Sequence, residues 1–478
     1  MPNHRSHFSL KSTFKYLPKY GYPLLVLLHV ALGALLFWLP EIGVYYGPLA
    51  AAFGLLLIVK NKDQNHEVLF AAAYLTGAEV LIRIMGGSSY ELAKYSVAVY
   101  VLFGLFFSGF SKKSWLYVAY LLLLVPSILI SEGLTGISKS TLVLLRINLN
   151  GPICLGLLAI YAFDKKISFG MLSRILLLVS LPALSIAVLV FLHSPAIDSI
   201  QIVDSNKYFS AMFGPNQVAT TLGLGMFLFF ARAILFSESY RLLAFNLVGA
   251  SFMAYVGLLT FSRGGMIVGV CTTLAMILFV YLRSGSYGKW RAKMGLLAFA
   301  GSFMTVVTVV AIQTDGLIIK RYTNQDHLGR TKRIKEGDRL VLATKEMNLF
   351  FDNSFAGVGV TKAEDARKSK SGRNYHTHNE ITRLLGEHGL MGLGCVVILI
   401  GVPIWLFLKR RRHVLLGVFF VFWFLSVNHI STRMLASAFF YALMLLQIDL
   451  APNNIFDRII VRDSFRKKLV PVTESSSI

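Results

Sequence analysis

The sequence predicts an all-α, polytopic membrane protein, and three observations carry this prediction. First, 55% of the 478 residues are hydrophobic and only 15% are charged, whereas a soluble domain has about a quarter charged residues. Second, several apolar runs reach the ~17–25 residues that a helix needs to cross a bilayer. Third, lysine and arginine are concentrated in alternate connections between these runs, as they are in cytoplasmic loops of membrane proteins.

The apolar runs divide the chain into about fourteen expected transmembrane helices. Each run is predominantly apolar and is bounded by polar, glycine-containing or proline-containing segments. The expected helices span 22–39, 44–59, 67–85, 90–110, 114–131, 143–163, 171–192, 215–236, 242–260, 265–283, 293–313, 389–408, 413–430 and 433–449.

The basic residues of the short connections also predict the orientation of the chain. With the N-terminus in the cytoplasm, more than half of the 47 Lys and Arg residues fall on the cytoplasmic side. An odd number of helices then precedes the one long connection, which we expect on the outer side. The expected parts are a cytoplasmic segment 1–21, eleven transmembrane helices in 22–313, the outer loop 314–388, three helices in 389–449 and a cytoplasmic basic tail 450–478.

The net charge does not require a nucleic-acid partner, and the cysteines do not suit disulfides or a metal site on the outer side. The charge of +23 follows mostly from the topology, so it requires no nucleic-acid partner. Cys154, Cys271 and Cys395 all lie inside expected helices. We therefore expect neither a disulfide framework nor a thiolate metal site on the outer side.

The outer loop is unusually long and basic, with 14 Lys and Arg against 10 Asp and Glu in 314–388. Structureless loops beyond ~12–15 residues are usually functional or disordered. Apolar residues recur at helical spacing in 339–351, which predicts an amphipathic helix on or beside the bundle. The stretch 361–374 is typical of a mobile, polar excursion, whose bases either form a solvated face or attract anions such as lipid headgroups.

Two arginines close to expected membrane spans are candidates for binding an anion. Arg263 joins two apolar helices with almost no loop, and Gly264 and Gly265 beside it allow close approach of a ligand or backbone. Its planar guanidinium suits bidentate contact with phosphate oxygens. Arg146 stands near the outer end of its span in the same way. The alternative for both is a snorkelling anchor at the membrane surface.

Two further charged pairs lie within expected helices and have a structural explanation. Glu79 and Arg83 are spaced i,i+4, and Glu91 and Lys94 open the next helix. Charges in membrane spans mostly pair with each other or line a cavity. We expect internal ion pairs or cavity walls here.

Histidines gather at 376–388, before an apolar run, where a proton acceptor near neutral pH would be available. A positioned imidazole that removes a proton gains ~10²–10⁴ in rate. His376 and His388 are expected at a helix end or on the surface. A zinc site is the competing interpretation, but this stretch is expected to begin a helix and offers no cysteine. Asn379 has the side chain of a helix N-cap.

These segments resemble a known family. His378-Asn379 with Gly389 and Gly392 fits the H-[NSQ]-x9-G-x-x-G pattern of lipopolysaccharide O-antigen ligases, whose larger family includes O-antigen and exopolysaccharide polymerases. Three further segments agree in order. "FGPNQVA" at 213–219, with Asn216, resembles the family's Gly-x-Pro-Asn element. "FSRGG" at 261–265 resembles its Ser-Arg-Gly turn, and 338–360 its loop arginine, helix and Gly-x-Gly turn.

The resemblance covers about 210–395, and the sequence departs from the family in two respects. Ala343 and Thr344 stand where a tryptophan often follows the loop arginine. About fourteen spans are expected, whereas the family's ligases usually have about twelve. These departures concern which branch of the family the chain resembles, more than its resemblance to the family.

The resemblance implies a GT-C type, metal-independent glycosyltransferase that needs no cofactor and lies in the inner membrane of a bacterium. The distribution of basic residues adds that both termini of the chain are cytoplasmic. Such an enzyme takes a glycan from undecaprenyl diphosphate at the periplasmic face and transfers it to a sugar hydroxyl, most simply of lipid A-core. His378 would be the base, and Arg263 and Arg339 would bind the diphosphate. Further candidates for the same role are Arg146, Arg330 and Arg321, and the supporting residues are Asn379, Asn216, Gly389 and Gly392.

Arg339 is preferred over Arg321 and Arg330 because it precedes the amphipathic helix, as the family's loop arginine does. Two other branches of the family remain open: a repeat-unit polymerase, and a protein O-oligosaccharyltransferase. The competitor from another class is a transporter or flippase of lipid-linked oligosaccharides. Transporters often have internal repeats and broken helices, and no repeat is found in this chain.

Overall fold

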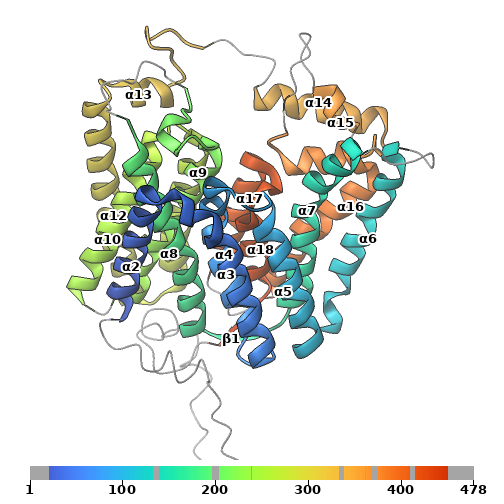
Figure 1. The fold of residues 1–478 in the computed structure, drawn as a ribbon, viewed down its shortest axis with the longest axis horizontal. Helices are drawn as coiled ribbons and strands as arrows, with labels where there is room; N and C mark the ends of the chain where they lie inside the picture. The colour runs from blue at the N-terminus through green and yellow to red at the C-terminus, as the bar shows by residue number, and fades with distance from the viewer. Residues whose placement is uncertain are drawn as a thin grey trace, which may run out of the picture.

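The computed structural model describes residues 21–132, 139–195, 204–237, 239–332, 338–360, 362–367, 375, 377–409 and 415–449. In these residues the chain is a helical bundle, and eleven of the described helices are long and apolar enough to cross a bilayer. The predicted all-α polytopic membrane fold is therefore confirmed (Figure 1).

Every expected span coincides with a helix of the structure. Three of them, α5, α17 and α18, are shorter than the other eleven. The helices at these positions are α2 (Gly21–Trp38), α3 (Pro40–Asn61), α4 (Glu67–Met85), α5 (Leu92–Ser108), α6 (Trp115–Glu132), α7 (Lys139–Ala162), α8 (Phe169–His193), α9 (Pro215–Phe236), α10 (Tyr240–Leu259), α11 (Arg263–Arg283), α12 (Ser286–Gln313), α16 (Glu380–Leu408), α17 (Leu416–Ile430) and α18 (Leu435–Met444).

The bundle is built around α4, α8, α9 and α18, whose side chains are mostly buried, while α2, α3 and α12 turn large apolar side chains outward. α9 crosses α11 at very short range. A Cβ at Gly223, Gly265 or Gly269 would collide with backbone of the opposite helix. Small residues permit such close helix crossings in membranes. This crossing holds the start of α11, and with it Arg263, against the start of α9.

Three short helices of the outer loop lie along one end of the bundle (Figure 1). They are α13 (Leu317–Tyr322), α14 (Arg339–Asp352) and α15 (Ala363–Arg367). α14 is the predicted amphipathic helix, and it packs on α16. At the opposite end, β1 (Lys166–Ser168) and β2 (Gln447–Asp449) form a two-stranded parallel sheet. These strands are too short for a sequence pattern to predict them.

α16 begins at Glu380, directly after its predicted cap Asn379, and it continues into the expected span 389–408 through a bend at Gly389. Gly389 has φ 60° and ψ −135°, a conformation that is essentially confined to glycine. The bend leaves backbone groups of α16 without hydrogen-bond partners in the helix, and the turn after α14 supplies these hydrogen bonds. Val358 N donates to Gly386 O at 3.1 Å, Gly359 N to Glu387 O at 3.0 Å, and Leu390 N to Ser354 O at 2.7 Å. The residue at which the span 389–408 was expected to begin is therefore the position of the bend in α16.

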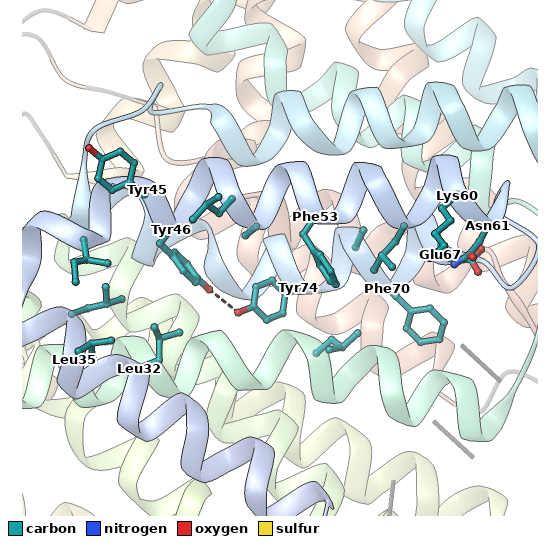
Figure 2. Close-up of a pocket in the computed structure, with 17 residues that line it drawn as sticks. Leu32, Leu35, Tyr45, Tyr46, Phe53, Lys60, Asn61, Glu67, Phe70 and Tyr74 are labelled. Atoms are coloured by element: carbon teal, nitrogen blue, oxygen red, sulfur yellow. Dashed lines mark hydrogen bonds between the residues drawn. The ribbon is translucent and has the colours of Figure 1, made fainter. Parts of the chain in front are cut away.

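An apolar groove of about 700 Å³ lies between α2, α3, α4 and α8 (Figure 2). Its walls are almost entirely aliphatic and aromatic, such as Leu35, Phe53 and Phe70. Tyr46 Oη donates to Tyr74 Oη at 3.1 Å within it. None of the residues of the candidate site described below lines this groove.

Candidate functional site

Three arginines that are far apart in the sequence meet beside α13 and α14, and we call Arg263, Arg321 and Arg339 the cation cluster. Arg263 Nη1 donates to the carbonyl of Arg321 at 3.2 Å. Arg321 Nε donates in turn to the carbonyl of Phe261 at 2.9 Å. Arg339, at the first position of α14, interacts electrostatically with both other arginines. α11, α13 and α14 thus each contribute one guanidinium.

The charges of the cation cluster oppose one another. Desolvation by the surrounding protein, together with the charges of Arg263 and Arg321, lowers the pKa of Arg339 to about 10. Burial and the charge of Arg263 also lower the pKa of Arg321, and this effect is partly offset by Asp204 at 2.9 Å. Like charges held together disfavour their own ionised forms. A bound anion would relieve this repulsion.

Asn216 positions the turn that carries Arg263. Its side-chain oxygen accepts a hydrogen bond from Ser262 Oγ at 2.7 Å. Pro215 occupies the first turn of α9, where a missing N–H costs no helical hydrogen bond. The Gly-x-Pro-Asn and Ser-Arg-Gly elements, which are distant in the sequence, are therefore in direct contact.

His378 is half-buried and immediately precedes α16. Asn379 is the N-cap of this helix, and its Oδ1 accepts from the backbone N–H of Ile381 at 2.9 Å and of Thr382 at 3.2 Å. On the other side, Arg433 Nη2 donates to the carbonyl of Thr377 at 2.6 Å. The backbone of His378 is thus held on both flanks, which limits where its imidazole can lie.

A second histidine, His429, lies against the turn that carries Arg263. The sequence did not predict it as a site residue. It stands near the end of α17 and is 3% exposed. Its ring packs against Gly264, where a Cβ would collide with the imidazole. Arg339 and His378 both act on it electrostatically. His429 therefore connects the cation cluster to His378.

Gly389 and Gly392 have packing roles in this arrangement. A Cβ at Gly389 would press on the backbone of Ser354 and Gly357, and one at Gly392 would strike the carbonyl of Leu384. Gly389 thus allows α16 to pack against the turn that follows α14, and Gly392 allows the two parts of α16 on either side of the bend to approach each other. The x9 spacing between His378-Asn379 and Gly389 is the length of α16 before its bend.

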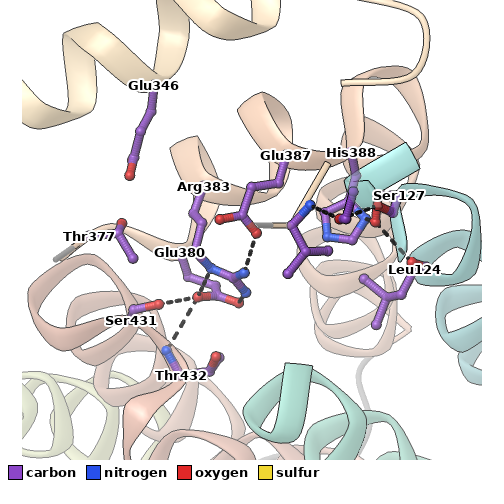
Figure 3. Close-up of polar contacts among 12 residues, drawn as sticks. Leu124, Ser127, Glu346, Thr377, Glu380, Arg383, Glu387, His388, Ser431 and Thr432 are labelled. Atoms are coloured by element: carbon purple, nitrogen blue, oxygen red, sulfur yellow. Dashed lines mark hydrogen bonds and ion pairs between the residues drawn. The ribbon is translucent and has the colours of Figure 1, made fainter. Parts of the chain in front are cut away.

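Buried ion pairs tie the same segment to the bundle (Figure 3). Arg383 contacts Glu380 at 2.5 Å and Glu387 at 2.6 Å. Glu380 also accepts hydrogen bonds from Ser431 Oγ and from the backbone N–H of Thr432. The turn between α17 and α18 is thereby joined to the start of α16, close to His378 in the sequence.

α14 and α15 are held to α16 by a second buried pair. Arg367 contacts Glu346 at 3.0 Å, and Thr382 Oγ1 donates to the other oxygen of Glu346 at 2.5 Å. The sequence allowed the bases around 362–373 to form a solvated face. That alternative is wrong for Arg367, which is 2% exposed because it neutralises a buried carboxylate. Residues 361 and 368–374 lie outside the described residues.

His388 also differs from its prediction as a surface or helix-end histidine. It is fully buried, and its Nδ1 lies 2.6 Å from Ser127 Oγ of α6 (Figure 3). The bend at Gly389 turns this side chain into the bundle. His376 lies outside the described residues.

Two predicted arginines are not brought into the cation cluster by any described contact. Arg146 is exposed on α7 and acts on Tyr95, with which it lines a separate cavity of about 430 Å³. Arg330 is exposed in a turn, where its backbone bonds to Asp326. The predicted internal ion pairs are confirmed: Arg83 lies 2.8 Å from Glu79, and Lys94 lies 2.9 Å from Glu91.

The arrangement suits the transfer of a group away from an anionic leaving group. The cation cluster offers guanidinium donors for phosphate oxygens, and His378 offers an imidazole for a proton. Among the residues that the structure describes, no group of three or more His, Cys, Asp and Glu side chains is placed to hold a metal ion.

The comparisons with known proteins agree with the resemblance seen in the sequence. Residues 248–397 match a family model described as O-antigen ligase. The match runs from α10 into α16 and includes Arg263, Arg339 and His378. No curated protein and no solved structure matches the chain. The match supports a glycosyltransferase-like activity of the kind found in O-antigen ligases and polymerases.

Proposed function

We propose that this chain, whose residues 248–397 match the O-antigen ligase family, transfers a glycan from undecaprenyl diphosphate to a sugar hydroxyl at the periplasmic face of the bacterial inner membrane. Lipid A-core is the proposed acceptor. The observation that carries the proposal is that Arg263, Arg321 and Arg339 interact with one another, and that Arg339 and His378 both act on the same imidazole, His429.

The cation cluster binds the diphosphate of the donor. Each guanidinium can donate two parallel hydrogen bonds to phosphate oxygens, and a charge-assisted bond is worth ~1.5–3 kcal/mol. The same contacts stabilise the undecaprenyl diphosphate that departs, because negative charge grows on its oxygens as the bond to the sugar breaks. We propose that these arginines take the place of a divalent metal, so that the reaction needs none.

His378 is the general base. The acceptor hydroxyl is a poor nucleophile until its proton is removed, and the imidazole of His378 accepts that proton as the oxygen attacks the anomeric carbon. The bond between this carbon and the diphosphate oxygen breaks, and the electron pair leaves with the diphosphate. Arg433 and Asn379 act on His378 through the backbone on either side of it.

The test is a transfer assay with the purified full-length protein in detergent. A defined undecaprenyl diphosphate-linked glycan is the donor, and either lipid A-core or a second lipid-linked repeat unit is the acceptor. Glycan should appear on lipid A-core, without added metal and in the presence of a chelator. Transfer to the second repeat unit alone would identify a polymerase instead. If the protein binds the donor but transfers glycan to neither acceptor, the result would contradict a transferase and favour a flippase. A flippase moves its substrate across a membrane, so it has no reaction to carry out in detergent.

A further inference from the structure

His429 is a buried imidazole whose nitrogens have no partner within the described part of the chain. It is 3% exposed, and neither Nδ1 nor Nε2 has a hydrogen-bond partner among the described residues. More than about nine tenths of buried polar groups in proteins are hydrogen-bonded. A buried side chain with two unpartnered polar atoms therefore indicates a ligand or water that completes it.

The position of His429 indicates the nature of that ligand. Its ring packs against Gly264, the residue after Arg263, so it borders the turn that carries one guanidinium of the cation cluster. It also lies within electrostatic range of Arg339, the guanidinium supplied by α14. Arg339 and the turn that carries Arg263 thus border the same imidazole.

The groups around His429 favour an anionic ligand. Arg339 and His378 both lie within electrostatic range of the buried ring. An imidazole carries an N–H donor in either of its protonation states. A phosphate oxygen accepts a hydrogen bond from this N–H, and its negative charge also balances the charge of Arg339, which a water or a neutral hydroxyl would not do.

We propose that His429 is a diphosphate-binding residue, whose imidazole N–H donates a hydrogen bond to a phosphoryl oxygen of the lipid-linked donor. This inference rests on the proposed function, because it takes the donor to be a lipid diphosphate. His429 complements the arginines, since it adds a directed hydrogen bond to the phosphoryl oxygen beside their charges. Gly264 is required beside Arg263 because any side chain there would occupy the place of this ring.

The test measures the binding of undecaprenyl diphosphate to the purified full-length protein. His429→Phe fills a similar volume but removes the N–H, and it should weaken binding about 10- to 100-fold, as the loss of a hydrogen bond to a charged group does. His429→Gln retains an N–H donor and should recover most of the affinity. His193→Phe is the matched control, since His193 is an exposed histidine at the end of α8. It should bind as the wild type does.

The outcomes separate this inference from the proposed function. A wild-type protein that does not bind undecaprenyl diphosphate overturns the proposed function itself. If the wild type binds and folded His429→Phe binds equally well, the role of His429 is wrong and the proposed function stands. Equal weakening by Phe and Gln also overturns the inference, because it would show that only the shape of the ring matters. His429→Met, with a flexible apolar side chain, replaces the Phe variant if that variant does not fold.

Discussion

At the scale of single residues, His378 and the cation cluster act on different partners, so substitutions should separate turnover from donor binding. His378→Ala should lower kcat by ~10²–10⁴ while leaving the Kd for undecaprenyl diphosphate nearly unchanged, because the base acts on the proton of the acceptor. Arg263→Ala and Arg339→Ala should raise that Kd ~10- to 100-fold, since each removes charge-assisted hydrogen bonds to the diphosphate. Lysine at either position should restore only part of the affinity, because an ammonium lacks the guanidinium fork. Steady-state kinetics and equilibrium binding in detergent measure both quantities.

Arg291→Ala is the control for these variants. Arg291 lies in the first part of α12, where it donates to the carbonyl of Ser237 at 3.0 Å, away from the cation cluster. Its loss should leave both kcat and Kd unchanged. Full turnover by a well-folded His378→Ala protein would contradict its role as the base, and unchanged donor affinity in both arginine variants would contradict the diphosphate site.

The site is predictable from the sequence where a residue carries its own signal. Arg263 beside two glycines and Asn379 as a helix cap are such cases, and the structure has Asn379 at the N-cap. His429 carries none, because it stands near the end of an almost entirely apolar helix and gains its meaning from Gly264, more than 150 residues earlier. Arg433 likewise reaches the carbonyl of Thr377 only because the turn between α17 and α18 packs against the start of α16. Neither contact can be predicted from the spacing of residues along the chain.

At the scale of elements, the bend of α16 supports the site, and one glycine makes it possible. Gly389→Ala should lower the melting temperature and the activity together, because a Cβ is strained at φ 60° and ψ −135° and would press on Ser354 and Gly357. Such backbone strain costs ~1–3 kcal/mol. Gly401→Ala is the matched control, since Gly401 lies in the same helix with open space around it. Thermal unfolding in detergent and the transfer assay provide the two measurements.

Gly401→Ala should be neutral or slightly stabilising, because alanine favours helix over glycine by ~1 kcal/mol. Equal stability and activity in the Gly389 and Gly401 variants would show that the bend has no role. A Gly389 variant that loses stability but retains full activity would separate the bend from the site.

Element positions were largely predictable because an apolar run long enough to cross a bilayer has few alternatives to a helix. α4 matches its predicted bounds, and α14 matches its predicted amphipathic pattern. α16 begins after its predicted cap, but the burial of its first turns was not predictable in the same way. Its first turns carry charged residues that normally indicate solvent, but Glu380, Arg383 and Glu387 neutralise one another and are buried. Polarity marks a membrane boundary only when the polar groups lack partners inside the protein.

At the scale of the whole molecule, the bundle separates two ends of different character. α13, α14 and α15 gather at one end with the cation cluster, and the β1–β2 pair closes the opposite end (Figure 1). The apolar surface of α2, α3 and α12 lies between these ends, as expected for a chain whose middle faces lipid. A lipid-linked diphosphate has the same division, with an anionic head and a long apolar chain. We therefore expect the cation cluster at one membrane surface.

The last prediction concerns which surface that is. From the positive-inside rule we predict that α13 and α14 lie on the periplasmic side. In a variant in which Cys154, Cys271 and Cys395 are replaced by alanine, a single cysteine is introduced either at Leu328, which is 61% exposed beyond α13, or at Tyr240, which is 90% exposed at the start of α10. A membrane-impermeant maleimide, applied to cells with a permeabilised outer membrane, should label the Leu328→Cys protein directly. It should label the Tyr240→Cys protein only after lysis.

The protein without cysteines should remain unlabelled throughout, and each single-cysteine variant must retain transfer activity. Labelling of Tyr240→Cys before lysis, with Leu328→Cys protected, would place the cation cluster and His378 in the cytoplasm. The proposed acceptor would then be wrong, because an enzyme facing the cytoplasm could not extend a glycan that is displayed on the other side of the membrane. The expected labelling would instead put the diphosphate site, the base and the acceptor on the same surface, which the proposed chemistry requires, since the acceptor oxygen must reach the anomeric carbon while the cation cluster still holds the leaving diphosphate.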